Sequence, residues 1–286
     1  MLAQKIEKKI AEIEDKNIFP PELVNFIKGV SLIQAKYFEI EDLDPLNISK
    51  ETIEDNFAKG KPILERKNFP LPLDKVKSLL TELLDFILAN EQLKDPGRVL
   101  ANDLEKEDFF YKSVQKFLEQ DDAFFRVYGE KLEQSPRLLS CVVQSSIAPF
   151  AVSITKQFLS LIPDAEYSFG HCPVCGSLPL ISALEDKAGT RKNYCSFCLF
   201  AYKVPRLQCV FCGEEYKKDH TYFYAKQLPG YRVDTCDKCK KYIKTIDFRK
   251  MDKFILPMLD DFISFPLDVK ARKEGYLRPT LSFWGF

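Results

Sequence analysis

The chain has 286 residues, which exceeds the usual size of one domain and favours two. Hydrophobic residues make up 45% and charged residues 29% of it, so a wholly disordered chain is excluded. Basic and acidic side chains balance at 42 each, so no overall basic excess indicates a nucleic-acid or anionic-membrane partner.

The charge balance changes along the chain. Residues 1–170 carry 22 basic and 29 acidic side chains, whereas residues 171–250 carry 15 basic and 8 acidic ones. The last 36 residues carry five of each sign. This change supports a domain boundary near residue 170.

Helical patterns fill the first part of the chain. Apolar residues recur with the spacing of an α-helix in about six segments. Prolines precede several of them, at a position where the missing amide is tolerated. Because short connections between such helices are typical of a bundle, we predict a helical bundle over residues 1–165. The segments are 6–13, 23–30, 76–87, 109–117, 124–128 and 138–162.

The stretch 138–162 is the most apolar of the chain. Gln144, Pro149 and Lys156 interrupt it, and a membrane span of about 20 residues tolerates such interruptions poorly. We therefore expect a buried helix with a proline kink, in which the Cys141 thiol is inert. The first residues, MLAQKIEKKIAEIEDK, lack the apolar core of a secretory signal, so we expect a cytoplasmic protein without a membrane span.

The sequence pattern changes after a joint at residues 163–170. Short β-branched or alternating segments follow, bounded by glycine, proline or a cysteine pair, which is typical of small β-hairpins. We predict hairpins too short to bury a core of their own over 166–250. A C-terminal helix and tail over 251–286 should be bent or divided at Pro266. The predicted strands are 178–184, 190–194, 201–204, 221–225, 231–233 and 242–248.

Eight of the nine cysteines form four Cys-x-x-Cys pairs, separated by gaps of 19, 10 and 23 residues. Such a turn brings two sulfur atoms near one point, and Gly176 and Gly213 supply the positive φ that two of the turns need. Two turns on neighbouring hairpins complete a tetrahedron of four thiolates around a metal ion. The predicted ligands are Cys172, Cys175, Cys195, Cys198, Cys209, Cys212, Cys236 and Cys239.

Two arrangements of these pairs are open. Gaps of 19 and 23 residues resemble those of zinc ribbons, so we favour 172/175 with 195/198 and 209/212 with 236/239. The alternative is a cross-brace that joins the first pair with the third and the second with the fourth. Zn²⁺ and Fe²⁺/Fe³⁺ both suit four thiolates, so either metal can fill the two four-cysteine sites. His171 and His220 are further possible ligands, but four cysteines already fill each site.

A closed site of four cysteines leaves no open coordination position, so it contributes folding energy and not Lewis-acid catalysis. No Gly-rich phosphate loop or Ser/His/Asp constellation stands out in the sequence. Only two histidines are available for acid–base chemistry. We therefore predict a protein that is not an enzyme.

The runs HCPVCGSLP, VPRLQCVFCG, DTCDKCKKYIKT and LDDFISFPLDVKARKEGYLRP, with the spacing of all four pairs, resemble one family. It is the formate dehydrogenase accessory, or formation, protein family of the FdhE type. The resemblance covers about residues 170–280, and Tyr202, Asp234 and Pro266 depart from the family pattern. It implies an α+β fold, with a helical N-terminal domain followed by two rubredoxin-like or zinc-ribbon metal sites.

The resemblance also implies a function. Members of this family mature molybdenum- or tungsten-dependent formate dehydrogenases and bind the catalytic subunit in the cytoplasm, so we expect that subunit as the partner. Several polar residues then become candidates for the partner surface, and support of the fold is the alternative role for each of them. These residues are Tyr242, Lys244, Asp260, Asp261, Tyr276 and Arg278.

Two other functions remain open at this point. A nucleic-acid-binding zinc ribbon would use the excess of basic side chains in residues 171–250. Eight thiolates and two divalent ions together add four negative charges, so the net charge of this region falls from +7 to about +3. It would also use the rings of Tyr194, Phe197, Phe200 and Tyr202 for stacking. An iron-dependent redox protein would use the four-cysteine sites as electron carriers. The sequence predicts no oligomeric state.

Overall fold

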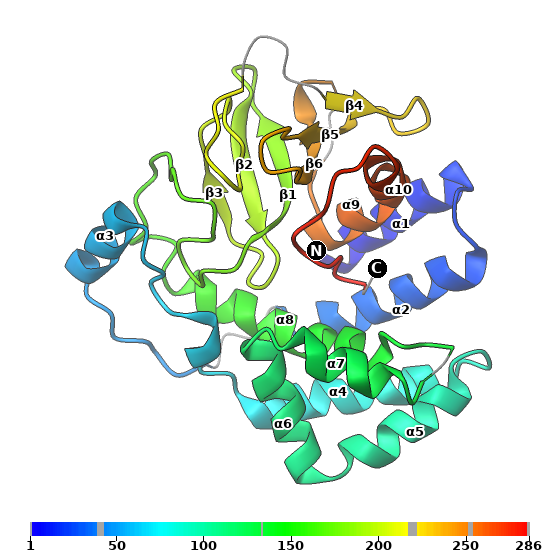
Figure 1. Cartoon of the computed structure of the whole chain (residues 1–286). Coiled ribbons are helices and arrows are strands. Elements are labelled where there is room, and N and C mark those ends of the chain that lie inside the picture. The colour runs from blue at the N-terminus through cyan, green and yellow to red at the C-terminus, as the bar shows by residue number, and fades with distance from the viewer. Residues whose placement is uncertain (1, 39–42, 133, 217–221, 251–253, 285–286) are drawn as a thin grey trace. The chain divides into compact units, whose positions relative to one another are not determined.

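The computed structural model describes residues 2–38, 43–132, 134–216, 222–250 and 254–284 (Figure 1). The chain divides into two compact units, each built from segments that are distant in the sequence. The sequence predicted three domains, 1–165, 166–250 and 251–286. That these parts fold independently stays a prediction. The first unit contains Met1–Pro45, Arg66–Gln157 and Phe283–Phe286, and the second contains Leu46–Glu65 and Phe158–Ser282.

Helices make up the first unit. They are α1 (Leu2–Lys16), α2 (Pro21–Ala35), α4 (Leu73–Leu88), α5 (Lys94–Leu104), α6 (Glu107–Leu118), α7 (Asp122–Gly129) and α8 (Leu138–Lys156), with the short 3-10 helix η1 (Arg66–Asn68). Amphipathic spacing explains them. In α1, Ile6, Ile10 and Ile13 recur every three or four residues and are all buried, so one face of the helix enters the core.

Helix α8 lies at the centre of this unit and packs against α2, α4, α6 and α7 (Figure 1). By length and composition it is able to cross a membrane, but 89% of its most apolar 18-residue window is buried within the protein. The predicted buried helix is therefore confirmed, and Pro149 lies inside it.

Two helices lie outside the predicted segments. In α5, Pro96 and Gly97 occupy the first turn, where the missing proline amide is tolerated, although both residues read as helix breakers. The other is α3 (Lys50–Lys59), in the second unit, where only Ile53 and Phe57 are buried. Its apolar stripe is therefore too short to stand out. Ser49 caps α3 by accepting a hydrogen bond from the Thr52 amide at 3.2 Å.

The second unit contains a six-stranded sheet. Its strands are β1 (Pro179–Glu185), β2 (Thr190–Cys195), β3 (Ala201–Lys203), β4 (Tyr222–Tyr224), β5 (Tyr231–Thr235) and β6 (Tyr242–Asp247), in the order β3-β2-β1-β6-β5-β4. Neighbouring strands pair antiparallel except β1 and β6, which pair in parallel. The hairpins are present where predicted, but they join into one sheet. The buried strands β1 and β6 give both halves a common core.

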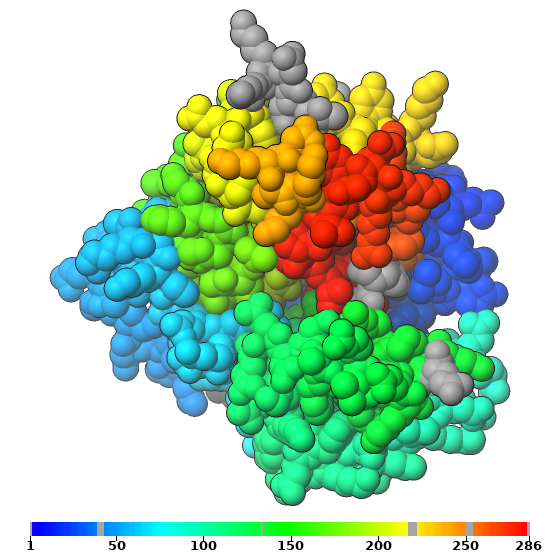
Figure 2. Space-filling model, viewed as in Figure 1, coloured from blue at the N-terminus to red at the C-terminus, as the bar shows by residue number. Residues whose placement is uncertain are grey.

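Two short helices pack on this sheet. Helix α9 (Pro257–Ile263) contacts β1, and α10 (Phe265–Lys273) contacts β5 and β6 (Figure 1). Pro266 lies at the start of α10, which confirms that the C-terminal helix is divided there. In Figure 2 the C-terminal segment, in red, lies against the orange turn between β5 and β6, where Leu277 pairs with Lys241. The short 3-10 helix η2 (Phe248–Lys250) follows β6.

Leu139 in α8 is fully buried. We expect Leu139→Ala to lower the free energy of unfolding by about 2–5 kcal/mol, because it loses apolar burial and leaves a cavity. Urea unfolding followed by circular dichroism measures the change. Val127→Ala, at a side chain 60% exposed, is the control and should change this free energy by about 0.5 kcal/mol or less. Equal effects would contradict a core position for α8.

Candidate metal centres

The eight predicted cysteine ligands gather into two groups of four. Within each group the sulfur atoms all lie within 4.8 Å of one another. The sequential arrangement of the pairs is confirmed, and the cross-brace is not found. The first centre contains Cys172, Cys175, Cys195 and Cys198, and the second centre contains Cys209, Cys212, Cys236 and Cys239.

All four Cys-x-x-Cys turns share one backbone geometry. The amide of the first cysteine donates to the carbonyl five residues later, as from Cys172 to Ser177 at 2.8 Å. The residue after the second cysteine has a positive φ in every turn. Glycine in the sequence signalled only two of these positions, since two turns use leucine and lysine instead. The four residues are Gly176, Leu199, Gly213 and Lys240.

Strand pairing brings the turns together. Strand β1 begins four residues after Cys175, and its first residue, Pro179, pairs with Cys195 at the end of β2. The first two turns therefore meet at one end of a hairpin. In the second centre, β5 and β6 flank the fourth turn. An isolated antiparallel β-bridge between Gln208 and Glu215 closes the third turn.

The sulfur–sulfur distances fit a tetrahedral metal ion. Four sulfurs at about 2.3 Å from one ion lie about 3.8 Å from one another. The amides of Phe197 and Phe211 also donate to Cys195 Sγ and Cys209 Sγ, which stabilises thiolates. Both centres can therefore hold an ion, and four thiolates suit zinc and iron alike. The distances are 3.7 Å for Cys172–Cys198, 3.3 Å for Cys175–Cys195, 3.8 Å for Cys209–Cys239 and 3.7 Å for Cys212–Cys236.

Of the two histidines considered as further ligands, His171 is not part of either group. His171 Nε2 lies 3.0 Å from the Tyr167 hydroxyl and 2.9 Å from the Gly60 carbonyl oxygen, so this nitrogen already has two hydrogen-bond partners. His220 lies outside the described residues. Cys141 is buried in α8, and burial raises the pKa of its thiol to about 11, as expected for an inert cysteine.

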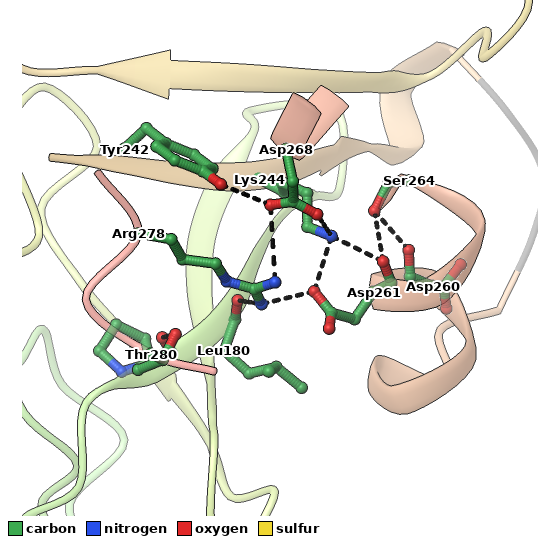
Figure 3. Close-up of polar contacts among 10 residues, drawn as sticks. Leu180, Tyr242, Lys244, Asp260, Asp261, Ser264, Asp268, Arg278 and Thr280 are labelled. Atoms are coloured by element: carbon green, nitrogen blue, oxygen red, sulfur yellow. Dashed lines mark hydrogen bonds and ion pairs between the residues drawn. The ribbon is translucent and has the colours of Figure 1, made fainter. Parts of the chain in front are cut away.

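The six residues predicted for a partner surface fall in two places. Tyr276 is partly exposed, and its hydroxyl donates to Asp237, which lies between Cys236 and Cys239, at 2.8 Å. The other five side chains are at most 6% exposed and belong to buried polar contacts between the sheet, α9, α10 and the C-terminal segment (Figure 3). They are Tyr242, Lys244, Asp260, Asp261 and Arg278.

Lys244 and Arg278 share two carboxylates in this buried cluster. Lys244 Nζ lies 2.8 Å from Asp261 Oδ1 and 2.6 Å from Asp268 Oδ2, and Arg278 Nη2 lies 2.5 Å from Asp261 Oδ1. Two positive and two negative charges therefore compensate one another away from water. Burial alone would raise the pKa of Asp261, but Arg278 and Lys244 hold it below its ordinary value. Asp268 lies outside the predicted set, because a single aspartate in a short helix gives no sequence signal.

The cluster connects the strands that leave the two centres. Arg278 also donates to the Leu180 carbonyl in β1 at 3.0 Å, and β1 follows the first cysteine pair. Lys244 lies in β6, which follows the fourth pair. Figure 3 shows these side chains converging from β6, α9, α10 and the C-terminal segment. Their partner-binding role stays a prediction.

Comparison with known proteins places these centres in a family. The family model described as "FdhE, central domain" matches residues 171–206, and the one described as "FdhE, C-terminal domain" matches residues 207–284. Each matched stretch contains one complete group of four cysteines. The chain belongs to the FdhE family.

Relatives extend the FdhE likeness over most of the chain. Protein FdhE homolog of Aquifex aeolicus is 29% identical over 281 residues, which are 95% of this chain and 92% of that protein. Protein FdhE of Escherichia coli K12 is 27% identical over 241 residues, 80% of this chain and 71% of that protein. The crystal structure of the FdhE protein from Pseudomonas aeruginosa has a TM-score of 0.70 at 17% identity, covering 99% of this chain and 95% of that one. The family and the α+β fold implied by the sequence are both confirmed.

Cys172→Ser and Cys236→Ser each remove one ligand from one centre. We expect each variant to bind one metal ion fewer than the unaltered chain and to lose stability, because binding energy at such sites is folding energy. Cys141→Ser is the control and should keep the full metal content. Metal analysis of the purified proteins gives the count, and a full count in Cys172→Ser would contradict the ligand assignment.

Asp261→Asn removes one negative charge of the buried cluster while keeping the size of the side chain. Lys244 and Arg278 then share a single carboxylate, so we expect a loss of about 3–5 kcal/mol in the free energy of unfolding, measured with urea. The control is Asp164→Asn, whose side chain is 87% exposed and pairs with Lys203. It should lose about 1 kcal/mol or less. A small loss in Asp261→Asn would show that the cluster does not hold the unit together.

Proposed function

We propose that this chain is a non-catalytic accessory protein of a molybdenum- or tungsten-dependent formate dehydrogenase. The observation that carries the proposal is the match of two FdhE family models to adjacent stretches that each contain a complete group of four cysteines. In this role the protein acts in the cytoplasm, binds the catalytic subunit and supports its assembly or activation, as a chaperone does.

Two metal ions, zinc or iron, complete the fold in this proposal. The four cysteines of each centre would hold one ion. Four thiolates fill the coordination sphere of such an ion, so no position is left for a substrate, and the ion supplies folding energy.

The partner surface is proposed around the fourth cysteine pair. Leu277 is 67% exposed, and its amide donates to the Lys240 carbonyl at 2.8 Å. Tyr276 beside it is partly exposed and contacts Asp237. Tyrosine is enriched at protein interfaces, and Leu277 adds an exposed apolar side chain beside it that a partner could cover. The buried Arg278 follows directly in the chain, so the charge cluster would hold this strip in place.

The alternative functions have less support. Base stacking requires exposed rings, but Tyr194, Phe197 and Tyr202 are at most 8% exposed, and of the four predicted rings Phe200 alone is partly exposed. An electron-carrying role requires iron in at least one centre, and a colourless, fully active zinc form would count against it.

Co-purification tests the proposal. An affinity-tagged chain, co-expressed with the formate dehydrogenase catalytic subunit of the same organism, should retain that subunit. Formate oxidation by the subunit should fall when the chain is omitted. Leu277→Ala should weaken retention about tenfold, because it removes an apolar contact.

The matched control is Val127→Ala, at another exposed apolar residue in the helical unit, which should leave retention unchanged. No retained subunit, together with normal formate oxidation in the absence of the chain, would overturn the proposed function.

A further inference from the structure

The two centres differ in the burial of their cysteines. The four cysteines of the first centre are at most 2% exposed. In the second centre, Cys209 and Cys236 are buried, but Cys239 is partly exposed and Cys212 is exposed. The first centre is therefore closed to solvent, whereas the second is open on one side.

A segment from the N-terminal part of the chain, named the cover segment here, is hydrogen-bonded to the first turn of the first centre. Residues 61–65 run along the turn between Cys172 and Cys175. The amides of Ile63 and Leu64 donate to the carbonyls of Pro173 and Val174, both at 2.9 Å. These hydrogen bonds fix the cover segment to the two residues that separate the first pair of ligands.

Polar side chains surround the open side of the second centre. Asp237 and Lys238, the residues between Cys236 and Cys239, have side chains that are 70% and 64% exposed. Lys238 forms an ion pair with Glu214, next to the third turn, at 2.5 Å. Because an exposed ion pair of this kind contributes little to stability, it holds this side of the centre only weakly.

Burial determines how easily a thiolate can leave a bound ion. When a thiolate at the surface loses its metal ion, water hydrates the charge that remains on the sulfur atom. A buried thiolate that lost its ion would instead remain an uncompensated charge in apolar surroundings. Release from the first centre therefore requires local opening of the cover segment, and such opening has a free energy of its own.

We infer that the second centre exchanges its metal ion with external thiolates through Cys212, while the first centre retains its ion. In this step the incoming sulfur forms a bond to the ion as the bond to Cys212 Sγ breaks. The bonding electron pair leaves with Cys212, so the oxidation state of the ion does not change. The incoming thiol gives its proton to water, and Cys212 takes one from water.

The test uses the full chain loaded with two zinc ions. The small dithiol dimercaptopropanesulfonate is added in excess, and native mass spectrometry counts the zinc that remains over time. One ion should leave at least about tenfold faster than the other, because only the second centre releases its ion without local opening. Release of both ions at one rate, or initial binding of fewer than two ions, would overturn the inference.

Alkylation assigns the fast phase to residues. With N-ethylmaleimide and peptide mapping, Cys212 and Cys239 should be labelled before the four cysteines of the first centre. Cys212→Ser should bind only the ion of the first centre, as expected for Cys236→Ser, so the fast phase is absent and the slow one remains. A fast phase that persists in this variant, or earlier labelling of the first centre, would assign the exchange to the wrong site and contradict the inference.

A matched pair of variants tests the cover segment. Leu64→Pro removes the amide that donates to the Val174 carbonyl and should accelerate the slow phase several-fold. Leu64→Ala keeps that amide and should leave the slow phase unchanged. An unchanged slow phase in folded Leu64→Pro would show that the cover does not retain the ion. If Leu64→Pro fails to fold, the wild-type release rates and the order of alkylation still decide the inference.

Discussion

The second unit depends on a single turn, used four times, in which a cysteine amide donates to the carbonyl five residues later. Each turn directs two sulfur atoms to one point, and two turns together form a tetrahedral site. Strands β1 and β6 start shortly after such turns, and their parallel pairing joins the two halves of the sheet. Neither half has to bury a core alone, because the buried strands β1 and β6 lie side by side and share one.

The buried charge cluster acts at the same junction. Its groups come from β6, α9, α10 and the C-terminal segment, and Arg278 also contacts the β1 backbone. Removing two pairs of charges from water is expensive, so the net stabilisation is small, but taking away one charge would leave another buried without compensation. The contacts of the cluster reach strands that leave both metal centres.

The sequence predicted the parts of this structure that depend on local spacing. Cysteine spacing identified all eight clustered residues, because a Cys-x-x-Cys turn is a local structure, and the long apolar stretch around Pro149 identified α8. The sequence did not predict which segments that are distant along the chain contact one another in the fold. Nothing in the sequence around Ile53 and Phe57 indicates that α3 belongs to the second unit. The parallel contact of β1 with β6, and the place of Asp268 in a charge cluster, likewise arise only from the tertiary fold.

The cover of the first centre has a consequence for the synthesis of the chain. Ile63 leaves the ribosome more than one hundred residues before its partner Pro173, so the cover segment is already available when the first hairpin forms. A fragment that starts at residue 166, where the sequence composition suggests a boundary, would contain all eight clustered cysteines but not the cover segment of the first centre. Water would then reach sulfur atoms that the whole chain protects. Metal titrations of such a fragment would therefore measure a first centre without its cover segment, and not the first centre of the whole chain.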